Sequence, residues 1–269
     1  MRVFRLTTVF LLALVLFACA KVPFTGRKQA RLLPSNMMNS MSFAQYDEFL
    51  KTNAPVTTGN DLAMVRRVGA RIQQAAEVYY KAQGMEKKLG EFAWEFNLVD
   101  SKEVNAWCMP GGKVVIYTGI LPITKNEDGL AVVMGHEIAH ALAHHGNERM
   151  SQQLAVQLGG LGLNEALQTQ PEQTRNIFMS AYGVGAQVGA LLPFSRLHES
   201  EADEIGLYLM AIAGYNVDEA APFWERMQRG AGSTPPTFLS THPAPDKRAE
   251  NLRVLAPKAR ELAKQYSIE

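Results

Sequence analysis

The feature that most constrains the fold is a pair of histidines four residues apart, His136 and His140, with Glu137 between them. An α-helix brings residues i and i+4 to one face, so both imidazoles can reach a single metal ion. Glu137 lies one step round that helix, where its carboxylate can exchange a proton with water at the ion. The string predicts a helix that carries two zinc ligands and a general base.

The residues around this string are those of a half-buried helix. Asn126 supplies a capping side chain, and Glu127 and Asp128 place negative charge in the first turn, which favours a helix start there. An apolar stripe lies beside the histidine face and consists of Leu130, Val133, Met134, Ile138 and Ala141.

A catalytic zinc site needs a third protein ligand and an open fourth position. The candidate is Glu199, in the segment 195–203, which has helical apolar spacing. Glu199 and Asp203 are four residues apart and share a face, whereas Glu201 points about 200° away from Glu199. We therefore expect Glu199 to bind the metal and Asp203 to hydrogen-bond the outer nitrogen of a ligand histidine.

Two further histidines follow the string directly. His144 and His145, interpreted as part of the same helix, match no zinc spacing. We expect them to be surface residues or residues that support the site from behind.

The N-terminus has the pattern of a secretion signal. Arg2 and Arg5 precede an uncharged apolar run over 9–20, which is shorter than the roughly 20 residues of a membrane-spanning helix. The four residues that end at Cys19 resemble a bacterial lipobox, which implies cleavage before Cys19 and its lipidation. A plain signal peptide cut near Ala18 or Ala20 is the alternative.

This pattern predicts a signal peptide over 1–18, and a lipidated Cys19 with a tether over 19–42. The predicted location faces the periplasm, with the lipid anchor on Cys19 holding the protein at the outer membrane. Positive and negative charges are nearly equal, at 27 Lys and Arg against 26 Asp and Glu. No basic excess is present for phosphate contacts, so we expect no nucleic-acid partner.

The remaining chain predicts an α+β fold that is mainly helical. Helical spacing covers 61–81, strand-like alternation covers 92–99 and 114–118, and the helical period dominates after Asn126. The stretch 177–194 contains no charged residue and is as long as a short membrane helix. Because it contains polar residues and three glycines, we favour a buried or site-covering helix, with a membrane helix as the alternative.

Four blocks in this order resemble the gluzincin zinc metallopeptidases that include HtpX, BepA and the CAAX prenyl proteases. The blocks are 105–112 with 117–119, 136–140, 195–203 and 241–248, and the similarity runs from about 61 to 263. The small periplasmic and lipoprotein members are the more similar ones. The resemblance implies a zincin-like metallopeptidase domain over 43–269.

The resemblance also implies roles for individual residues. It implies one Zn²⁺ held by His136, His140 and Glu199. Glu137 would be the general base, and Asp203 would be the family's acidic partner residue. Block 105–112 would be an edge strand of the small sheet, and it would bind a polypeptide substrate as an added strand. The residues implied for that contact are Asn105, Ala106 and Trp107.

The function implied is a zinc metalloendopeptidase of the bacterial cell envelope that degrades unfolded or misassembled proteins. One alternative is a chaperone-like assembly factor whose protease site is restrained. Another is a membrane-embedded prenyl-protein protease, which would need 177–194 in the bilayer.

His242 is the last histidine of the chain and is followed by Pro243 and Pro245. The resemblance brings this segment over the metal cleft. There His242 could occupy the open zinc position, or it could stabilise the oxyanion of the transition state. We favour the first role, and a purely structural histidine is the remaining alternative.

Overall fold

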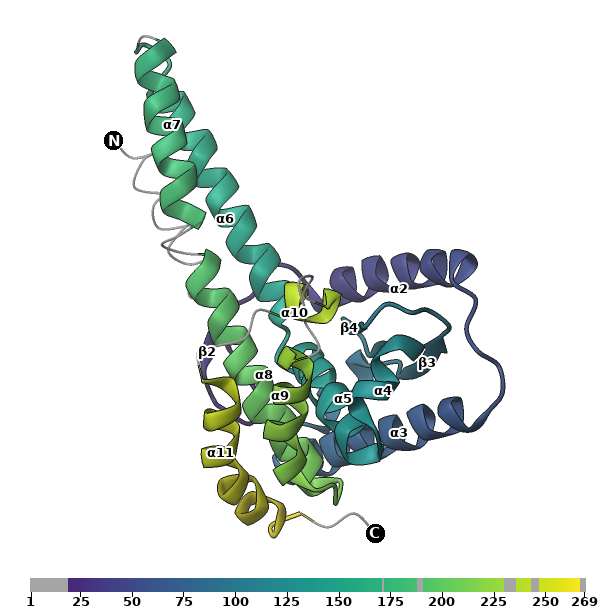
Figure 1. Ribbon diagram of the computed structural model, residues 1–269. Helices are drawn as coiled ribbons and strands as arrows, with labels where there is room; N and C mark the ends of the chain where they lie inside the picture. The colour runs from purple at the N-terminus through teal and green to yellow at the C-terminus, as the bar shows by residue number, and fades with distance from the viewer. Residues whose placement is uncertain (1–18, 171, 188–190, 230–235, 243–246, 267–269) are drawn as a thin grey trace.

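The computed structural model describes residues 19–170, 172–187, 191–229, 236–242 and 247–266. Within these ranges the protein is mainly helical and carries two small sheets (Figure 1). The α+β class expected from the sequence is confirmed. The signal peptide predicted over 1–18 lies outside the described residues.

The helix expected over 61–81 and the strands expected over 92–99 and 114–118 are present, and helices dominate after Asn126. The strands are β1 (Cys19–Lys21), β2 (Lys28–Ala30), β3 (Glu95–Val99), β4 (Ala106–Met109) and β5 (Lys113–Tyr117). The longer helices are α2 (Ser35–Thr52), α3 (Asn60–Ala82), α5 (Glu127–Leu142), α6 (His145–Ala166), α7 (Glu172–Ala186), α8 (Leu192–Ile212), α9 (Ala220–Arg229) and α11 (Arg248–Ala263). The short elements are η1 (Glu86–Glu91), η2 (Thr118–Ile120), α4 (Leu121–Thr124), η4 (Val217–Glu219) and α10 (Thr237–Thr241).

The three-stranded sheet has the order β3-β5-β4, with β3 parallel and β4 antiparallel to the central strand. Within the described residues β4 is therefore an edge strand, and its backbone groups point alternately toward β5 and away from it. The Tyr117 amide donates to the Asn105 carbonyl oxygen at 3.2 Å, which fixes this alternation. The backbone groups of Ala106 and Cys108 consequently face away from the sheet.

Helix α5 lies at the centre of the fold, in contact with α3, α8 and β4. All of its residues except Glu127, Asp128 and His140 are buried, so the apolar surface extends well beyond the predicted stripe. The helix begins where the sequence predicts, because the Asn126 side-chain oxygen accepts a hydrogen bond from the Gly129 amide at 3.0 Å.

Helices α5 and α8 cross with their backbones in contact at two glycines. A Cβ atom on Gly206 would lie 2.9 Å from backbone atoms of Gly135 and His136, and one on Gly135 would lie 2.9 Å from the Gly206 carbonyl oxygen. Residues without side chains allow this close approach. The crossing places the face of α5 that carries His136 and His140 directly against the acidic face of α8.

Residues 19–34, which the sequence suggested as part of a tether, are folded onto the domain. Strands β1 and β2 form an antiparallel hairpin. Val22 is buried in the main core, and the ring of Phe24 stacks on Tyr79 with centroids 3.6 Å apart. A short hairpin anchored by single side chains leaves no periodic signal in the sequence, so pattern analysis did not detect it.

Helices α6 and α7 form a pair that projects away from the rest of the molecule (Figure 1). The Tyr182 hydroxyl joins them by donating to the Val156 carbonyl oxygen at 2.7 Å. The expectation that 177–194 forms a buried helix is wrong for the part in α7, where Phe178 is 52% and Val184 is 65% exposed. Among the helices described, none combines the length and apolar composition of a transmembrane span.

The glycine contact between α5 and α8 gives a direct test of the fold. Gly206→Ala should lower the free energy of unfolding by about 1–3 kcal/mol, because the new methyl group forces the two backbones apart. Urea unfolding of purified protein measures the change. Gly162→Ala is the matched control, since nothing lies within 4 Å of that position on α6. The control should instead gain about 0.5–1 kcal/mol, and an equal loss in both variants would contradict the close crossing.

Candidate metal centre

Helix α5 holds its two predicted ligands on one face. The Nε2 atoms of His136 and His140 lie 3.1 Å apart. Glu137 is buried beside them. The i, i+4 spacing therefore has the consequence expected from helix geometry.

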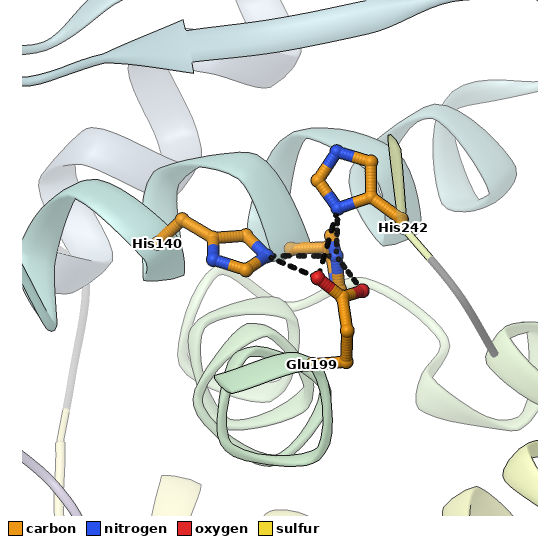
Figure 2. Close-up of side chains that lie close together, drawn as sticks. His140, Glu199 and His242 are labelled. Carbon is orange, nitrogen blue, oxygen red and sulfur yellow. Dashed lines mark hydrogen bonds and ion pairs between the residues drawn. The ribbon is translucent and has the colours of Figure 1, made fainter. Parts of the chain in front are cut away.

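Glu199 and His242 complete the group from two distant parts of the chain. The Glu199 carboxylate, on α8, lies 3.3 Å from His136 Nε2 and 3.4 Å from His140 Nε2. His242, which follows α10, places Nδ1 3.2 Å from Glu199 Oε1 and 3.3 Å from His136 Nε2. Figure 2 shows the rings of His140 and His242 directed at this carboxylate. The structure thus brings together the three predicted ligands and His242.

The four donors have the spacing of a tetrahedral zinc site. One donor atom from each residue lies within 4.8 Å of the others. A tetrahedron with donors about 2.05 Å from its centre has edges of about 3.3 Å, and the measured separations scatter around that value. Three imidazole nitrogens aimed at one point repel each other unless a cation lies between them. Glu199 Oε2 is also buried and has no hydrogen-bond partner among the described residues, so the group fits one zinc ion.

The charges of the donors also suit a cation. Burial alone raises the pKa of Glu199, but the adjacent imidazoles of His136, His140 and His242 outweigh it and hold that pKa well below its usual range. Burial lowers the pKa of His140 well below its usual range, so this imidazole is neutral. Burial also lowers the pKa of His136, but its bonds to Asp203 and Glu199 outweigh burial and raise it to about 9. Metal binding would therefore release a proton from His136.

Asp203 lies behind His136, as the helical-face argument predicts. Its Oδ1 accepts a hydrogen bond from His136 Nδ1 at 3.0 Å, which leaves Nε2 free to bind a metal. Arg248, at the start of α11, donates to the same oxygen at 2.6 Å, and its guanidinium lies 3.3 Å from the centroid of the Trp224 ring. The burial of this arginine was not predicted, because its position at the end of block 241–248 gave no sign of it.

His145 takes a supporting place behind His140. The two Nδ1 atoms lie 2.8 Å apart. Burial lowers the pKa of His145 to about 4, so the ring is neutral. The assumption that His145 continues the helix of His140 is wrong, because α5 ends at Leu142 and His144 adopts φ 54°. This change of direction turns His145 back toward the ligand, and the spacing alone could not show it.

Glu201 points away from the metal donors, as expected. It belongs to a buried cluster with Glu148 and Arg27, in which Arg27 Nη2 lies 2.7 Å from an oxygen of each carboxylate. His145 contacts Glu201 at 3.0 Å, and His198 contacts Glu148 at 2.9 Å. Burial raises the pKa of both carboxyls, but hydrogen bonds from Arg27 and these histidines lower each pKa to about 2. Neither Arg27 nor Glu148 was predicted from the sequence as part of the site.

The donors open onto a cleft of about 560 Å³. Its lining includes the segment 105–110, which contains edge strand β4, and the residues Gln187 and Leu191 between α7 and α8. Of the described part of 177–194, Gln187 and Leu191 line the cleft. The backbone of Cys108 hydrogen-bonds to Glu137, which ties β4 to the predicted base. The three residues implied for substrate contact, Asn105, Ala106 and Trp107, all line the cleft.

Comparisons with known proteins agree with this centre. Residues 66–256 match the model for peptidase family M48. The mitochondrial metalloendopeptidase OMA1 of Saccharomyces cerevisiae is 38% identical over 199 residues, which are 70% of this chain and 55% of that protein. Human mitochondrial OMA1 is 28% identical over 249 residues, which are 88% of this chain and 46% of that protein. The beta-barrel assembly-enhancing protease of Escherichia coli is 31% identical over 180 residues, which are 65% of this chain and 37% of that protein.

These relatives correct one expectation from the sequence. The chain spans about half the length of the OMA1 relatives it matches. Relatives in yeasts, a plant and animals are named as mitochondrial enzymes, which contradicts the predicted periplasm-facing location at the outer membrane. The lipobox pattern is short and lies outside the matched family region. Lipidation of Cys19, which was part of the same prediction, has no support from the comparisons.

The metal centre predicts a zinc-dependent gain in stability. Zinc at 100 times its dissociation constant should raise the free energy of unfolding by about 2.7 kcal/mol, and a chelator should reverse this. Glu199→Gln should lose most of the gain, because the only anionic donor is gone. Glu204 lies on α8 with Glu199, but its carboxylate pairs with Lys258 of α11 at 2.8 Å, so Glu204→Gln should keep the gain. Denaturant unfolding with and without zinc measures both, and equal gains would show that Glu199 is not a ligand.

Proposed function

The chain belongs to peptidase family M48, and on that premise we propose that it is a metalloendopeptidase that hydrolyses peptide bonds with one zinc ion. The observation that carries this proposal is the convergence of His136, His140 and Glu199 beside the buried carboxylate of Glu137. When bound, zinc supplies Lewis-acid chemistry that polarises a carbonyl group and activates water near neutral pH. We assign metal binding to these two histidines and Glu199.

Glu137 has the surroundings of a general base. It is 2% exposed, and its Oε1 has no hydrogen-bond partner among the described residues. Burial raises the pKa of this carboxyl, although His242 and His136 oppose the effect. A raised pKa suits a carboxylate that takes a proton from water and returns it to the leaving nitrogen. Asp203 supports the reaction indirectly by holding His136 in the required orientation.

Strand β4 is the element to which we assign substrate binding. An extended peptide can pair with an exposed sheet edge through backbone hydrogen bonds. The outward-facing backbone groups belong to Ala106 and Cys108, and the Cys108 backbone already contacts Glu137. Asn105 and Trp107 would contact substrate through side chains. Asn105 Oδ1 already accepts a hydrogen bond from the Ala106 amide at 2.9 Å. An added strand must displace that side chain.

This mode of binding supports unfolded or misassembled polypeptides as the substrate class. Pairing along a backbone discriminates weakly among side chains, but it requires several residues in extended conformation. A folded protein seldom exposes such a segment outside its own sheets. We therefore propose quality control of non-native proteins as the role of the activity.

His242 restrains the site in the conformation described. Its Nδ1 occupies the fourth vertex of the donor group, and its Nε2 lies 3.3 Å from Glu137 Oε1. A catalytic zinc site needs that vertex for water or substrate. The same observation favours a second candidate function, a chaperone-like factor that binds non-native chains and keeps its protease site closed.

Substitution of the base tests the proteolytic function. Glu137→Gln should abolish cleavage of an unfolded casein substrate while the zinc content remains one per chain, because the base is lost and the ligands are intact. Glu127→Gln, at the exposed start of the same helix, should cleave normally. If wild-type protein with bound zinc leaves casein intact but prevents its aggregation, the chaperone-like function replaces the proposal.

Substitution of His242 tests the restraint. His242→Ala should raise kcat/KM, about tenfold for each 1.4 kcal/mol by which His242 favours the closed state. If His242 instead stabilised the oxyanion, kcat would fall by about 10²–10³ with zinc content unchanged. Ser240→Ala, an exposed position on α10, is the matched control. Activity equal to wild type in His242→Ala would leave this histidine a structural residue.

A further inference from the structure

The N-terminal hairpin and the proposed metal ligand His140 are connected by an unbroken series of polar contacts that are buried or partly buried. We infer that Arg27 is a positioning residue for His140 and acts through Glu201 and His145. This inference rests on the zinc site proposed above, but it does not depend on which reaction the site performs. It makes the hairpin that was expected to be a tether part of the metal centre.

The first step follows from the chemistry of imidazole. If Nε2 of His140 binds the metal, its single proton must be on Nδ1. The partner of His140 Nδ1 is His145 Nδ1 at 2.8 Å, which accepts this hydrogen bond only when it carries no proton itself. The proton of His145 is then on Nε2. One tautomer of each ring satisfies all of these requirements.

Glu201 selects that tautomer of His145. Its Oε2 lies 3.0 Å from His145 Nε2, and a carboxylate can only accept. Glu201 therefore holds the proton of His145 on Nε2 and leaves Nδ1 as the acceptor for His140. Outer partners of this kind fix the orientation of metal-binding histidines and raise their basicity. Here a second histidine stands between the carboxylate and the ligand.

Arg27 keeps Glu201 in place beside a second buried anion. Arg27 Nε donates to Glu201 Oε2 at 2.8 Å, and Nη1 and Nη2 donate to the two oxygens of Glu148 at 2.9 and 2.7 Å. Both carboxylates are 3% exposed, so without a cation between them they would repel each other strongly. Thr25 adds a hydrogen bond to Glu201 Oε1 at 2.5 Å. No other Lys or Arg among the described residues pairs with Glu148 or Glu201.

The hairpin itself is rigidly attached, so Arg27 is held in a fixed position. The Phe24 amide donates to the Tyr79 hydroxyl at 2.9 Å, and the two rings are stacked. The Val22 amide donates to the Arg27 carbonyl oxygen at 2.8 Å, which closes the turn that carries the guanidinium. The planar fork of arginine matches this pair of carboxylates better than the single ammonium of lysine would.

Zinc affinity, measured by competition with a chelator of known affinity, tests the inference on the full chain. Arg27→Gln should weaken zinc binding by about 10–100-fold, the usual effect of losing an outer partner. Arg27→Lys keeps the charge and should recover part of that loss. Arg67→Gln is the matched control, because Arg67 forms an exposed ion pair with Glu127 and should bind zinc as wild type does. The unfolding temperature of each zinc-free variant is recorded alongside.

A purely structural role for Arg27 gives a different result. In that case Arg27→Gln would lower the unfolding temperature of the zinc-free protein while the folded protein bound zinc with wild-type affinity, which would overturn the inference. Failure of the wild-type protein to bind zinc would instead contradict the proposed metal site. The two failures are therefore distinguishable.

A double substitution tests the route through His145. His145→Phe keeps a ring stacked on His198, whose centroid lies 4.3 Å away, but removes the acceptor for His140. It should weaken zinc binding as much as Arg27→Gln does, and it tests the last step even if Arg27→Gln fails to fold. Combining the two should add little further loss, because both act on the same bond. Fully additive losses would show that Arg27 does not act through His145.

Discussion

The close crossing of α5 and α8 is the contact on which the site depends. Gly135 and Gly206 let the two backbones touch, and this brings the ligands of one helix within hydrogen-bonding distance of the acids of the other. A bulkier pair would separate the helix axes, and a shift of even 1 Å exceeds the tolerance of zinc–ligand distances. The site is thus a consequence of backbone packing in the core, and its geometry is as rigid as that core.

Local spacing was sufficient to predict three donors and Asp203, because all of them lie on helices where position in sequence fixes position on a face. Helix α3 and the start of α5 were equally readable from periodicity and capping. His145 was not, because a left-handed residue at His144 changes the chain direction and leaves no composition signal. Arg27 and Arg248 were missed for another reason: burial of a charged side chain depends on partners far away in sequence.

His242 differs from the other donors in how it is held. The other three donors belong to long helices that pack in the core, whereas His242 follows a helix of five residues. Its displacement would break contacts with Glu199 and Glu137 but would leave the helical frame unchanged. A site with three fixed donors and one replaceable donor can keep its metal while it exposes a coordination position, which agrees with the restraint we propose.

Each ligand histidine of α5 is supported from behind by an arginine, and the two arginines come from opposite ends of the described chain. Arg27 and Glu201 are 174 positions apart, and Arg248 and His136 are 112 apart. Contacts of such long range form late in folding, because large loops must close first. A chain still being synthesised, with residue 248 not yet added, would hold an incomplete centre. Synthesis must therefore pass residue 248 before the centre can gain its full metal affinity.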